Sequence, residues 1–461
     1  MLIRHLPYHE DSASLFARIA HLPWAVFLDS VHPGNAYGRY DIISCNPFIT
    51  LSTAGELTRI VEPDGERSSE EDPFDLLQGI LQRYPARVTE LPFCGGAIGY
   101  FSYDLARRLE RLPTLAIDAE QMPEMAIGMY DWAVVVDHHA RQTRLVGQGN
   151  DTASDEKWDD LAALFSAPAP PARAGHGFSV TSAVTSNMDA QGYRDRFARV
   201  QAYIRNGDCY QVNLAQRFSA AAEGDPWQAY LQLREIGPAP FACYLNTPAG
   251  QVLSASPERF LSVRRGRVET RPIKGTRPRS SDPVIDQANA EDLAASLKDR
   301  AENLMIVDLL RNDIGKNCAV GSVGADRLFA LESYANVHHL VSTVTGVLAL
   351  GRDPIDLLRG CFPGGSITGA PKLRAMQIIE ELEPHRRGVY CGAIGYISFD
   401  GSMDTSIAIR TAVYSHGELR FWAGGGVVAD SEADKEYRET WDKASGMLAL
   451  TERCGAPRVG R

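Results

Sequence analysis

An acid and an amine are predicted to lie together in one hairpin of the C-terminal half. Residues on either side of Arg264-Arg265-Gly266 alternate between apolar and polar types, which predicts two strands joined by a three-residue loop with a left-handed glycine. Closing that loop pairs residues 263 and 267, and brings Glu258 and Lys274 to one face, one diagonal step apart. A carboxylic acid beside an amine has the groups for proton transfer and nucleophilic attack. An exposed cross-strand ion pair would have the same spacing.

Two expected helices each carry a pair of carboxylates three residues apart. One helix is expected in segment 298–310 and the other in segment 432–443. The pairs are Asp299 with Glu302, and Glu436 with Glu439. Side chains at this spacing share a helix face, and carboxylate oxygens suit a hard divalent cation such as Mg²⁺. Solvated charged faces show the same spacing, so the pattern alone leaves both interpretations open.

Two glycine-rich segments predict places where the backbone can approach a ligand. The segment 362–372, Phe-Pro-Gly-Gly-Ser-Ile-Thr-Gly-Ala-Pro-Lys, leads into an expected helix with Pro371 in its first turn. Backbone amides at such a helix start suit a carboxylate or a phosphate. It is not a nucleotide-binding P-loop, because Gly369 is followed by Ala-Pro. The run 424–426 is a second such place, and tight turns without a ligand remain the alternative for both.

The elements that position these residues fall on either side of a composition break. Residues 166–177 are too rich in proline and glycine for a helix interior or a central strand. Before the break, 132–137 and 143–147 predict a strand pair around a short turn. After it, helix and strand patterns alternate irregularly, which indicates an α+β fold with mixed, layered β-sheets flanked by helices. The expected division is an N-terminal region over 1–150, a linker over 151–186 and a catalytic region over 187–461.

A five-residue segment of the N-terminal region recurs near the C-terminus. Gly-Ala-Ile-Gly-Tyr occupies 96–100 and again 392–396, and each copy is followed by a serine and an aspartate at the same spacing. We interpret the copies as equivalent strands whose glycines permit close backbone approach. They suggest a pseudo-repeat, a hypothesis that non-equivalent surroundings would contradict.

Composition limits the classes of function. The 461 residues are 44% hydrophobic and 23% charged, which is typical of a globular protein of more than one core. A net charge of -11 argues against nucleic acid as the main partner. We see neither an apolar run long enough to span a membrane nor a signal peptide. The eight cysteines show no zinc spacing, so we expect reduced, buried thiols and a cytoplasmic protein.

Four long motifs identify a family resemblance. From about residue 187 to 447 the chain resembles the chorismate-binding enzymes, which include the anthranilate and isochorismate synthases, and the segments before the linker look like that family's N-terminal portion. The motifs are Gly-Asp-Cys-Tyr-Gln-Val-Asn-Leu (207–214), Leu-Ser-Ala-Ser-Pro-Glu-Arg-Phe (253–260), His-His-Leu-Val-Ser (338–342) and Pro-Gly-Gly-Ser-Ile-Thr-Gly-Ala-Pro-Lys (363–372). The resemblance implies that family's large layered fold and chorismate as substrate.

Lys274 distinguishes the branches of this family. Anthranilate synthases typically have Pro-Ile-Ala-Gly-Thr where this chain has Pro-Ile-Lys-Gly-Thr. With lysine at this position, the chain resembles the branch that converts chorismate and ammonia to 4-amino-4-deoxychorismate, a precursor of p-aminobenzoate and folate. There the lysine amine attacks C2, the C4 hydroxyl leaves, and ammonia then adds at C4. The alternatives are an anthranilate synthase, an isochorismate-forming relative, and a non-catalytic tryptophan-binding paralogue.

The resemblance also implies roles for single residues. Glu258 would donate a proton to the C4 oxygen, and Mg²⁺ would bind the ring carboxylate of chorismate. The residues implied in metal binding are Glu302 and Glu439, with Asp299 and Glu436 nearby or bridging through water. Those implied in substrate binding are Tyr390, Arg410 and Gly425 for the enolpyruvyl carboxylate, with Gly275, Thr276 and Lys443 in the same pocket. His339 is expected to orient the substrate.

A partner subunit and a second small-molecule ligand are also expected. The chain has no Gly-x-Cys-x-Gly elbow for a glutamine amidotransferase nucleophile, so the resemblance implies a partner glutaminase subunit that supplies ammonia. Phe27-Leu-Asp-Ser30 stands where anthranilate synthases carry a Leu-Leu-Glu-Ser feedback motif, which suggests a pocket for L-tryptophan without feedback inhibition. The residues expected in that pocket are Ser30, Tyr37, Gly38, Arg39, Tyr40, Pro240, Phe241 and Ala242.

Overall fold

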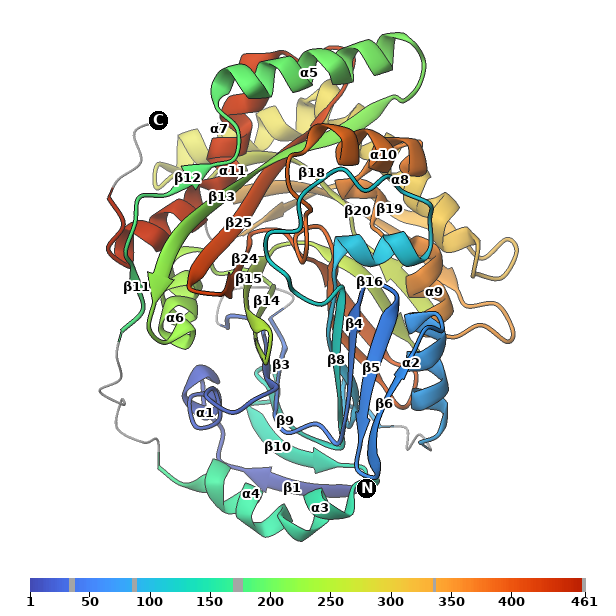
Figure 1. Cartoon of the computed structure of the whole chain (residues 1–461), viewed down its shortest axis with the longest axis vertical. Helices are drawn as coiled ribbons and strands as arrows, with labels where there is room; N and C mark the ends of the chain where they lie inside the picture. The colour runs from blue at the N-terminus through green and yellow to red at the C-terminus, as the bar shows by residue number, and fades with distance from the viewer. Residues whose placement is uncertain (33–37, 85–88, 169–176, 335–336, 458–461) are drawn as a thin grey trace.

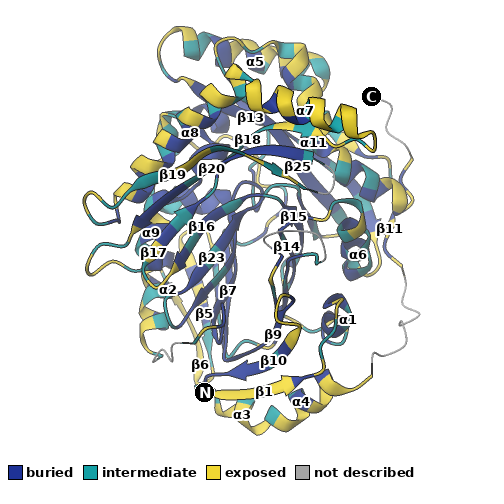
Figure 2. Cartoon of the chain, turned by 180° about the vertical axis from the view of Figure 1, so that it is seen from behind, coloured by how far each residue is buried: buried dark blue, intermediate teal, exposed yellow. Residues whose placement is uncertain are grey.

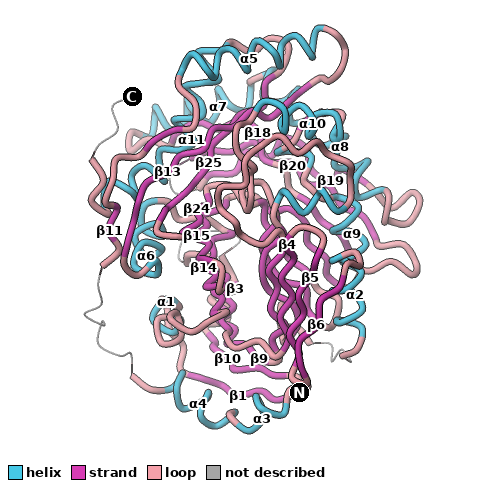
Figure 3. Tube along the Cα trace, in the orientation of Figure 1, coloured by secondary structure: helices cyan, strands magenta, loops and turns pink. Residues whose placement is uncertain are grey.

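A computed structural model of the chain describes residues 1–32, 38–84, 89–168, 177–334 and 337–457. Two large antiparallel sheets form the centre of the molecule, and helices cover its outside (Figure 1). Figure 3 shows the same arrangement, with the helices placed around the strands. The α+β class and the layered sheets predicted from the sequence are confirmed.

The first sheet contains strands from both ends of the chain. Its neighbours run β1-β10-β9-β3-β2-β14-β15-β24-β25-β13-β11, and β12 and β21 also pair with β13. The strands are β1 (Leu2–Leu6), β2 (Ala25–Asp29), β3 (Tyr40–Ser44), β9 (Trp132–Asp137), β10 (Gln142–Gly147), β11 (Ser179–Val180), β12 (Thr185–Ser186), β13 (Gln211–Glu223), β14 (Phe241–Thr247), β15 (Gly250–Ser256), β21 (Gly369–Ala370), β24 (Thr411–Ser415) and β25 (Glu418–Val427).

The second sheet is built in the same way. Its order is β18-β20-β17-β16-β23-β22-β7-β8-β4-β5-β6, with β19 pairing with β20. The strands are β4 (Ile49–Ala54), β5 (Leu57–Glu62), β6 (Gly65–Ser69), β7 (Gly96–Phe101), β8 (Met125–Tyr130), β16 (Arg259–Arg264), β17 (Arg267–Thr270), β18 (Ile273–Pro278), β19 (Gly324–Ser333), β20 (Val337–Val347), β22 (Ala393–Ser398) and β23 (Met403–Ile407).

Several helices begin at an Asp-Pro pair. In α2, α6, α7 and α9 the aspartate accepts a backbone N–H of the first turn, and the proline occupies a position whose own N–H would lack a partner. The helices are α1 (Ala13–Phe16), α2 (Pro73–Gln82), η1 (Tyr103–Arg108), α3 (Thr152–Glu156), α4 (Trp158–Ser166), α5 (Ala190–Arg205), α6 (Pro226–Ile236), α7 (Pro283–Ala295), α8 (Leu297–Gly315), α9 (Pro354–Cys361), η2 (Gly365–Ile367), α10 (Lys372–Leu382) and α11 (Ala433–Arg453).

Both sheets cross the expected boundary between the N-terminal and catalytic regions. β2 pairs with β14 in the first sheet, and β7 pairs with β22 in the second. The stretch 151–186 contains α3, α4, β11 and β12, while residues 169–176 lie outside the described residues. The division into an N-terminal region, a linker and a catalytic region therefore remains a prediction from the sequence. The strand pair expected at 132–137 and 143–147 is confirmed as β9 and β10.

The two copies of Gly-Ala-Ile-Gly-Tyr form adjacent strands with equivalent surroundings. β7 and β22 pair antiparallel, so that Gly99 lies opposite Gly395. A Cβ at Gly96 would meet the backbone of residues 397–399 at the end of β22 and just beyond, and a Cβ at Gly392 would meet the backbone of residues 101–103 at the end of β7 and just beyond. The glycines therefore allow the close approach that the sequence predicted. The pseudo-repeat hypothesis passes this test.

The hairpin predicted around Gly266 exists, but its register was predicted wrongly. Val263 pairs with Val268, not with residue 267. The loop has two residues, because Arg265 (φ 50°) and Gly266 (φ 75°) are both left-handed, as in the turn that matches strand twist. The error arose because a non-glycine residue was not expected at positive φ.

Buried residues concentrate in the strands, and the outward faces of α3, α4, α5 and α7 are exposed (Figure 2). All eight cysteines are buried and free, as the sequence predicted. In the described ranges, no helix combines the length and apolarity needed to cross a membrane.

Candidate active site

Glu258 and Lys274 lie close enough to affect each other's ionisation. Glu258 immediately precedes β16, and Lys274 lies in β18, which continues the line of β17 along the same edge of β20. Burial raises the pKa of the Glu258 carboxyl, and the Lys274 ammonium opposes that rise. Burial lowers the pKa of Lys274, and the positive charge of Lys443 lowers it further. The predicted proximity of acid and amine is thus found, but the predicted diagonal placement in one hairpin is not, because Lys274 lies in β18, which pairs with β20 and not with β16.

Glu258 is held by hydrogen bonds to two serine hydroxyls and one backbone group. Ser366 Oγ donates to Glu258 Oε1 at 2.9 Å, and both side chains are buried. The backbone N–H of Glu258 donates to Ser256 Oγ at 3.3 Å, and its carbonyl accepts from Ile407 N at 3.0 Å. The carboxyl group therefore has a fixed position at the start of the strand.

Two of the four predicted metal ligands meet at one glycine, and a third lies near them. A Cβ at Gly425 would lie 3.1 Å from Glu436 Oε2 and 3.3 Å from Glu439 Oε1, so both carboxylates of α11 meet at this glycine of β25. Glu302 on α8 interacts electrostatically with Glu439. Burial raises the pKa of Glu302 and of Glu436, and the neighbouring Glu439 raises both further.

Asp299 is committed elsewhere. Its carboxylate pairs with Arg277 at 3.3 Å, and it packs against Gly275, where a Cβ would lie only 2.9 Å from Asp299 Cγ. Gly275 also has a φ of +74°, so two constraints require glycine at this position. The two carboxylates of the predicted i, i+3 pair on α8 therefore have different contacts. Glu302 lies near the carboxylates of α11, and Asp299 packs against the β18 backbone.

His339 and Thr276 face each other across the β18–β20 pair. Thr276 Oγ1 and His339 Nδ1 form a hydrogen bond of 3.0 Å. Burial lowers the pKa of His339 to about 4, so the imidazole is neutral at physiological pH. A neutral imidazole can orient a ligand through a hydrogen bond but adds no positive charge.

Positive charge in the site comes from Arg410 and Lys443. The guanidinium of Arg410 donates to the carbonyl of Lys443, and burial lowers the Arg410 pKa. Lys443 Nζ lies 2.6 Å from Glu439 Oε1 and donates to Gly424 O at 3.0 Å. The buried ring of Tyr390 interacts electrostatically with Arg410 and stacks on a tryptophan of β25. The predicted substrate-binding residues Tyr390, Arg410, Gly425 and Lys443 thus adjoin one another.

The comparisons with known proteins identify the family. A family model described as chorismate binding enzyme matches residues 31–449. The chain belongs to the chorismate-binding enzymes. It is 48% identical over 452 residues to a protein of Escherichia coli (strain K12) named aminodeoxychorismate synthase component 1, covering 97% of this chain and 98% of that one.

Two other members of the family show how far the similarity extends. A protein of Acetivibrio thermocellus named anthranilate synthase component 1 is 36% identical, with 97% of this chain and 94% of that one covered. The crystal structure of anthranilate synthase component I from Streptococcus pneumoniae TIGR4 superposes with a TM-score of 0.80 at 32% identity, covering 91% of this chain and 94% of that chain. The fold predicted from the family resemblance is therefore confirmed.

Sequence reasoning assigned no role to two polar side chains of this chorismate-binding enzyme. Gln211 and Asn213 on β13 are buried, and among the described residues Gln211 Nε2 and Asn213 Oδ1 lack hydrogen-bond partners. They face Gly426 and Gly424, where a Cβ would lie 2.7 and 2.8 Å from those atoms. The available signal was their alternation with the apolar Val212 and Leu214 at the start of this strand.

The expected tryptophan-pocket residues surround a cavity of about 340 Å³ that residues of both sheets line. The lining includes the predicted Ser30, Arg39, Tyr40, Pro240, Phe241 and Ala242. Gly38 is described but is not among the lining residues, and Tyr37 lies outside the described residues. The backbone N–H and hydroxyl of Ser30 both donate to Asp41 Oδ1, at 2.7 and 2.6 Å, so its hydroxyl proton is already used.

Proposed function

We propose that this chain is the component of aminodeoxychorismate synthase that aminates chorismate, giving 4-amino-4-deoxychorismate for p-aminobenzoate and folate synthesis. One observation carries the proposal: the pKa of the Lys274 amine is lowered, and it lies beside the Glu258 acid, whose pKa is raised. The similarity to proteins named aminodeoxychorismate synthase component 1 supports the same conclusion.

Lys274 and Glu258 have complementary tasks in this reaction. The neutral amine of Lys274 forms a bond to C2 of chorismate as the C4–oxygen bond breaks, and Glu258 gives its proton to the departing oxygen, which leaves as water. Ammonia then bonds to C4 while the bond between C2 and the lysine nitrogen breaks. The ammonia nitrogen loses one proton, and Glu258 regains one. The enolpyruvyl ether is retained.

The directions of the pKa shifts of Lys274 and Glu258 agree with their roles as nucleophile and acid. An unperturbed lysine is neutral in only about one molecule in a thousand near pH 7. Because burial and Lys443 lower the pKa of Lys274, the neutral fraction increases. Because burial raises the pKa of Glu258, its proton is retained to higher pH. The neutral amine is lost below the pKa of Lys274 and the acid proton is lost above that of Glu258, so both groups shape the pH–activity profile.

We further propose Mg²⁺ as the cofactor. The described residues contain no group of three or more His, Cys, Asp or Glu side chains that could hold a metal by themselves. Mg²⁺ is commonly bound by one or two protein carboxylates together with water and a substrate anion. The convergence of Glu436 and Glu439 at Gly425, with Glu302 nearby, fits that donor set. When bound, Mg²⁺ neutralises charge on the ring carboxylate of chorismate.

The remaining polar residues fit the second carboxylate of the substrate. Arg410 and Lys443 supply two adjacent positive charges, and Tyr390 lies beside Arg410. His339, neutral because of its burial, orients the substrate by hydrogen bonding and is itself fixed by Thr276. These residues bind and orient the substrate and transfer no proton.

Ammonia would come from a partner glutamine amidotransferase subunit. The relatives' names include "component 1", which implies a second component. All eight cysteines here are buried, so none is placed as a glutaminase nucleophile. We propose the cytoplasm as the site of action, where free thiols persist. We also propose L-tryptophan as a structural ligand of the 340 Å³ cavity, without feedback inhibition.

Product analysis tests the proposed function. The chain is incubated with chorismate, Mg²⁺ and ammonium, and a lyase that releases p-aminobenzoate is then added. Formation of p-aminobenzoate is expected. Anthranilate would refute the assignment, as would unchanged chorismate under conditions where the folded protein binds it. Mass spectrometry of the enzyme with chorismate but no ammonium should show an adduct on Lys274.

A further inference from the structure

The glycine-rich loop has a tight internal structure that leaves it little freedom to move. A Cβ at Gly365 would lie 2.5 Å from Leu309 Cδ2, so α8 packs directly on the loop backbone. Thr368 Oγ1 donates to Gly364 O at 3.1 Å, closing the loop on itself. Arg387 Nη1 donates to Ile367 O at 2.9 Å from the inside of the molecule. The loop backbone is therefore fixed from both sides.

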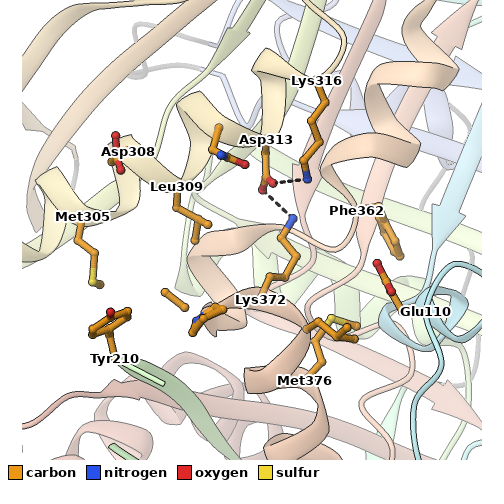
Figure 4. Close-up of a pocket in the computed structure, with 14 residues that line it drawn as sticks. Glu110, Tyr210, Met305, Asp308, Leu309, Asp313, Lys316, Phe362, Lys372 and Met376 are labelled. Carbon is orange, nitrogen blue, oxygen red and sulfur yellow. Dashed lines mark hydrogen bonds and ion pairs between the residues drawn. The ribbon is translucent and has the colours of Figure 1, made fainter. Parts of the chain in front are cut away.

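Lys372 anchors the far end of the loop. Its Nζ donates to Asp313 Oδ2 at 2.6 Å and to Cys361 O at 2.8 Å, which joins the last residue of the loop motif to the residue just before it. Lys316 contacts the same aspartate at 3.1 Å (Figure 4). Asp313 is buried and balanced by two ammonium groups. The loop thus acts as a rigid support.

One side chain transmits this rigidity to the active site. Ser366 Oγ donates a hydrogen bond to Glu258 Oε1 at 2.9 Å. No described residue donates a hydrogen bond to Glu258 Oε2. A hydroxyl that donates to one carboxyl oxygen keeps that oxygen an acceptor, so the proton of the neutral acid belongs on the other oxygen.

We propose that Ser366 is a positioning residue for Glu258, which fixes the carboxyl rotamer and keeps the transferable proton on Oε2. The proposal rests on the proposed function, because it assigns the proton that Glu258 gives to the C4 oxygen. Ser366 itself touches no reacting atom in this scheme. It acts through Glu258, and the loop holds it there.

The test compares Ser366→Ala with Ser366→Thr, which keeps a hydroxyl. In ammonium-dependent amination, Ser366→Ala should lower kcat about tenfold or more with little change in KM for chorismate, since a misplaced acid costs rate and not binding. The ionised carboxylate loses a hydrogen bond, so the Glu258 pKa rises and the limb of the pH profile that follows Glu258 moves to higher pH. Ser366→Thr should restore kcat and the limb.

Two results would overturn the proposal. One is a Ser366→Ala enzyme with the wild-type kcat and pH profile. The other is an equal loss in both variants with no movement of the limb that follows Glu258, which would show that Ser366 only supports the fold. If wild-type protein fails to aminate chorismate, the proposed function fails separately. Carboxyl NMR titration of Glu258 then still tests the contact, and an unchanged pKa in folded Ser366→Ala would refute it.

Discussion

Gly425→Ala is the sharpest test of the proposed metal site. The new methyl group would lie 3.1 Å from Glu436 Oε2 and 3.3 Å from Glu439 Oε1, closer than most carbon contacts in proteins. Gly425 is in extended backbone, so the substitution adds bulk without backbone strain. The two carboxylates must move by a few tenths of an ångström to accommodate it.

The expected magnitude follows from the geometry that Mg²⁺ requires. The ion needs nearly ideal octahedral coordination at about 2.0–2.1 Å, so small ligand displacements are costly. Disturbing the groups that orient metal ligands typically weakens binding about 10- to 100-fold, or about 1.4–2.7 kcal/mol. We therefore expect Gly425→Ala to require about 10 to 100 times more Mg²⁺ for half-maximal amination.

Calorimetric titration of Mg²⁺ in the presence of chorismate, together with the Mg²⁺ dependence of the rate, measures this change. Gly446→Ala is the matched control, because Gly446 lies on α11, the helix that carries both glutamates, and a methyl group added there would enter open space. The control should bind Mg²⁺ like the wild type. Equal affinity in Gly425→Ala would refute the assignment of Glu436 and Glu439 to the metal site.

Three further substitutions test other parts of the site. Lys274→Ala should lose most ammonium-dependent amination, and the exposed Lys435→Ala should not; comparable rates in steady-state assays would exclude the lysine nucleophile. Lys443→Met should move the limb of the pH–rate profile that follows Lys274 to higher pH, because Lys274 then holds its proton more tightly; an unmoved limb contradicts this. Lys372→Met should lower the free energy of unfolding in urea by about 1–3 kcal/mol, whereas Lys316→Met should cost under about 0.5 kcal/mol, and equal losses would argue against the loop anchor.

Side-chain chemistry was more predictable from the sequence than backbone geometry. The meeting of Glu258 with Lys274 was anticipated, yet the hairpin register was not, because Arg265 adopts a positive φ that residue type does not favour. The i, i+3 spacing on α8 was also correct. It could not reveal that Arg277, close by in the chain but on β18, binds Asp299.

The roles of the glycine-rich loop depended on contacts distant in sequence. Glycine content indicated close backbone approach, and the structure shows that α8 packs against Gly365. The partner of Ser366 lies 108 residues earlier in the chain. Local patterns contain no information about such pairs, and only tertiary packing brings them together.

The interleaving of early and late strands has a consequence for synthesis on the ribosome. The free edge of β2 is covered only when β14 has been made, and that of β7 only when β22 follows, nearly three hundred residues later. Nascent chains must therefore carry exposed β edges through most of translation, a condition that favours wrong pairing and slow folding. The first half of this enzyme is an incomplete structure that needs its last strands, and chaperones have a long interval in which to protect it.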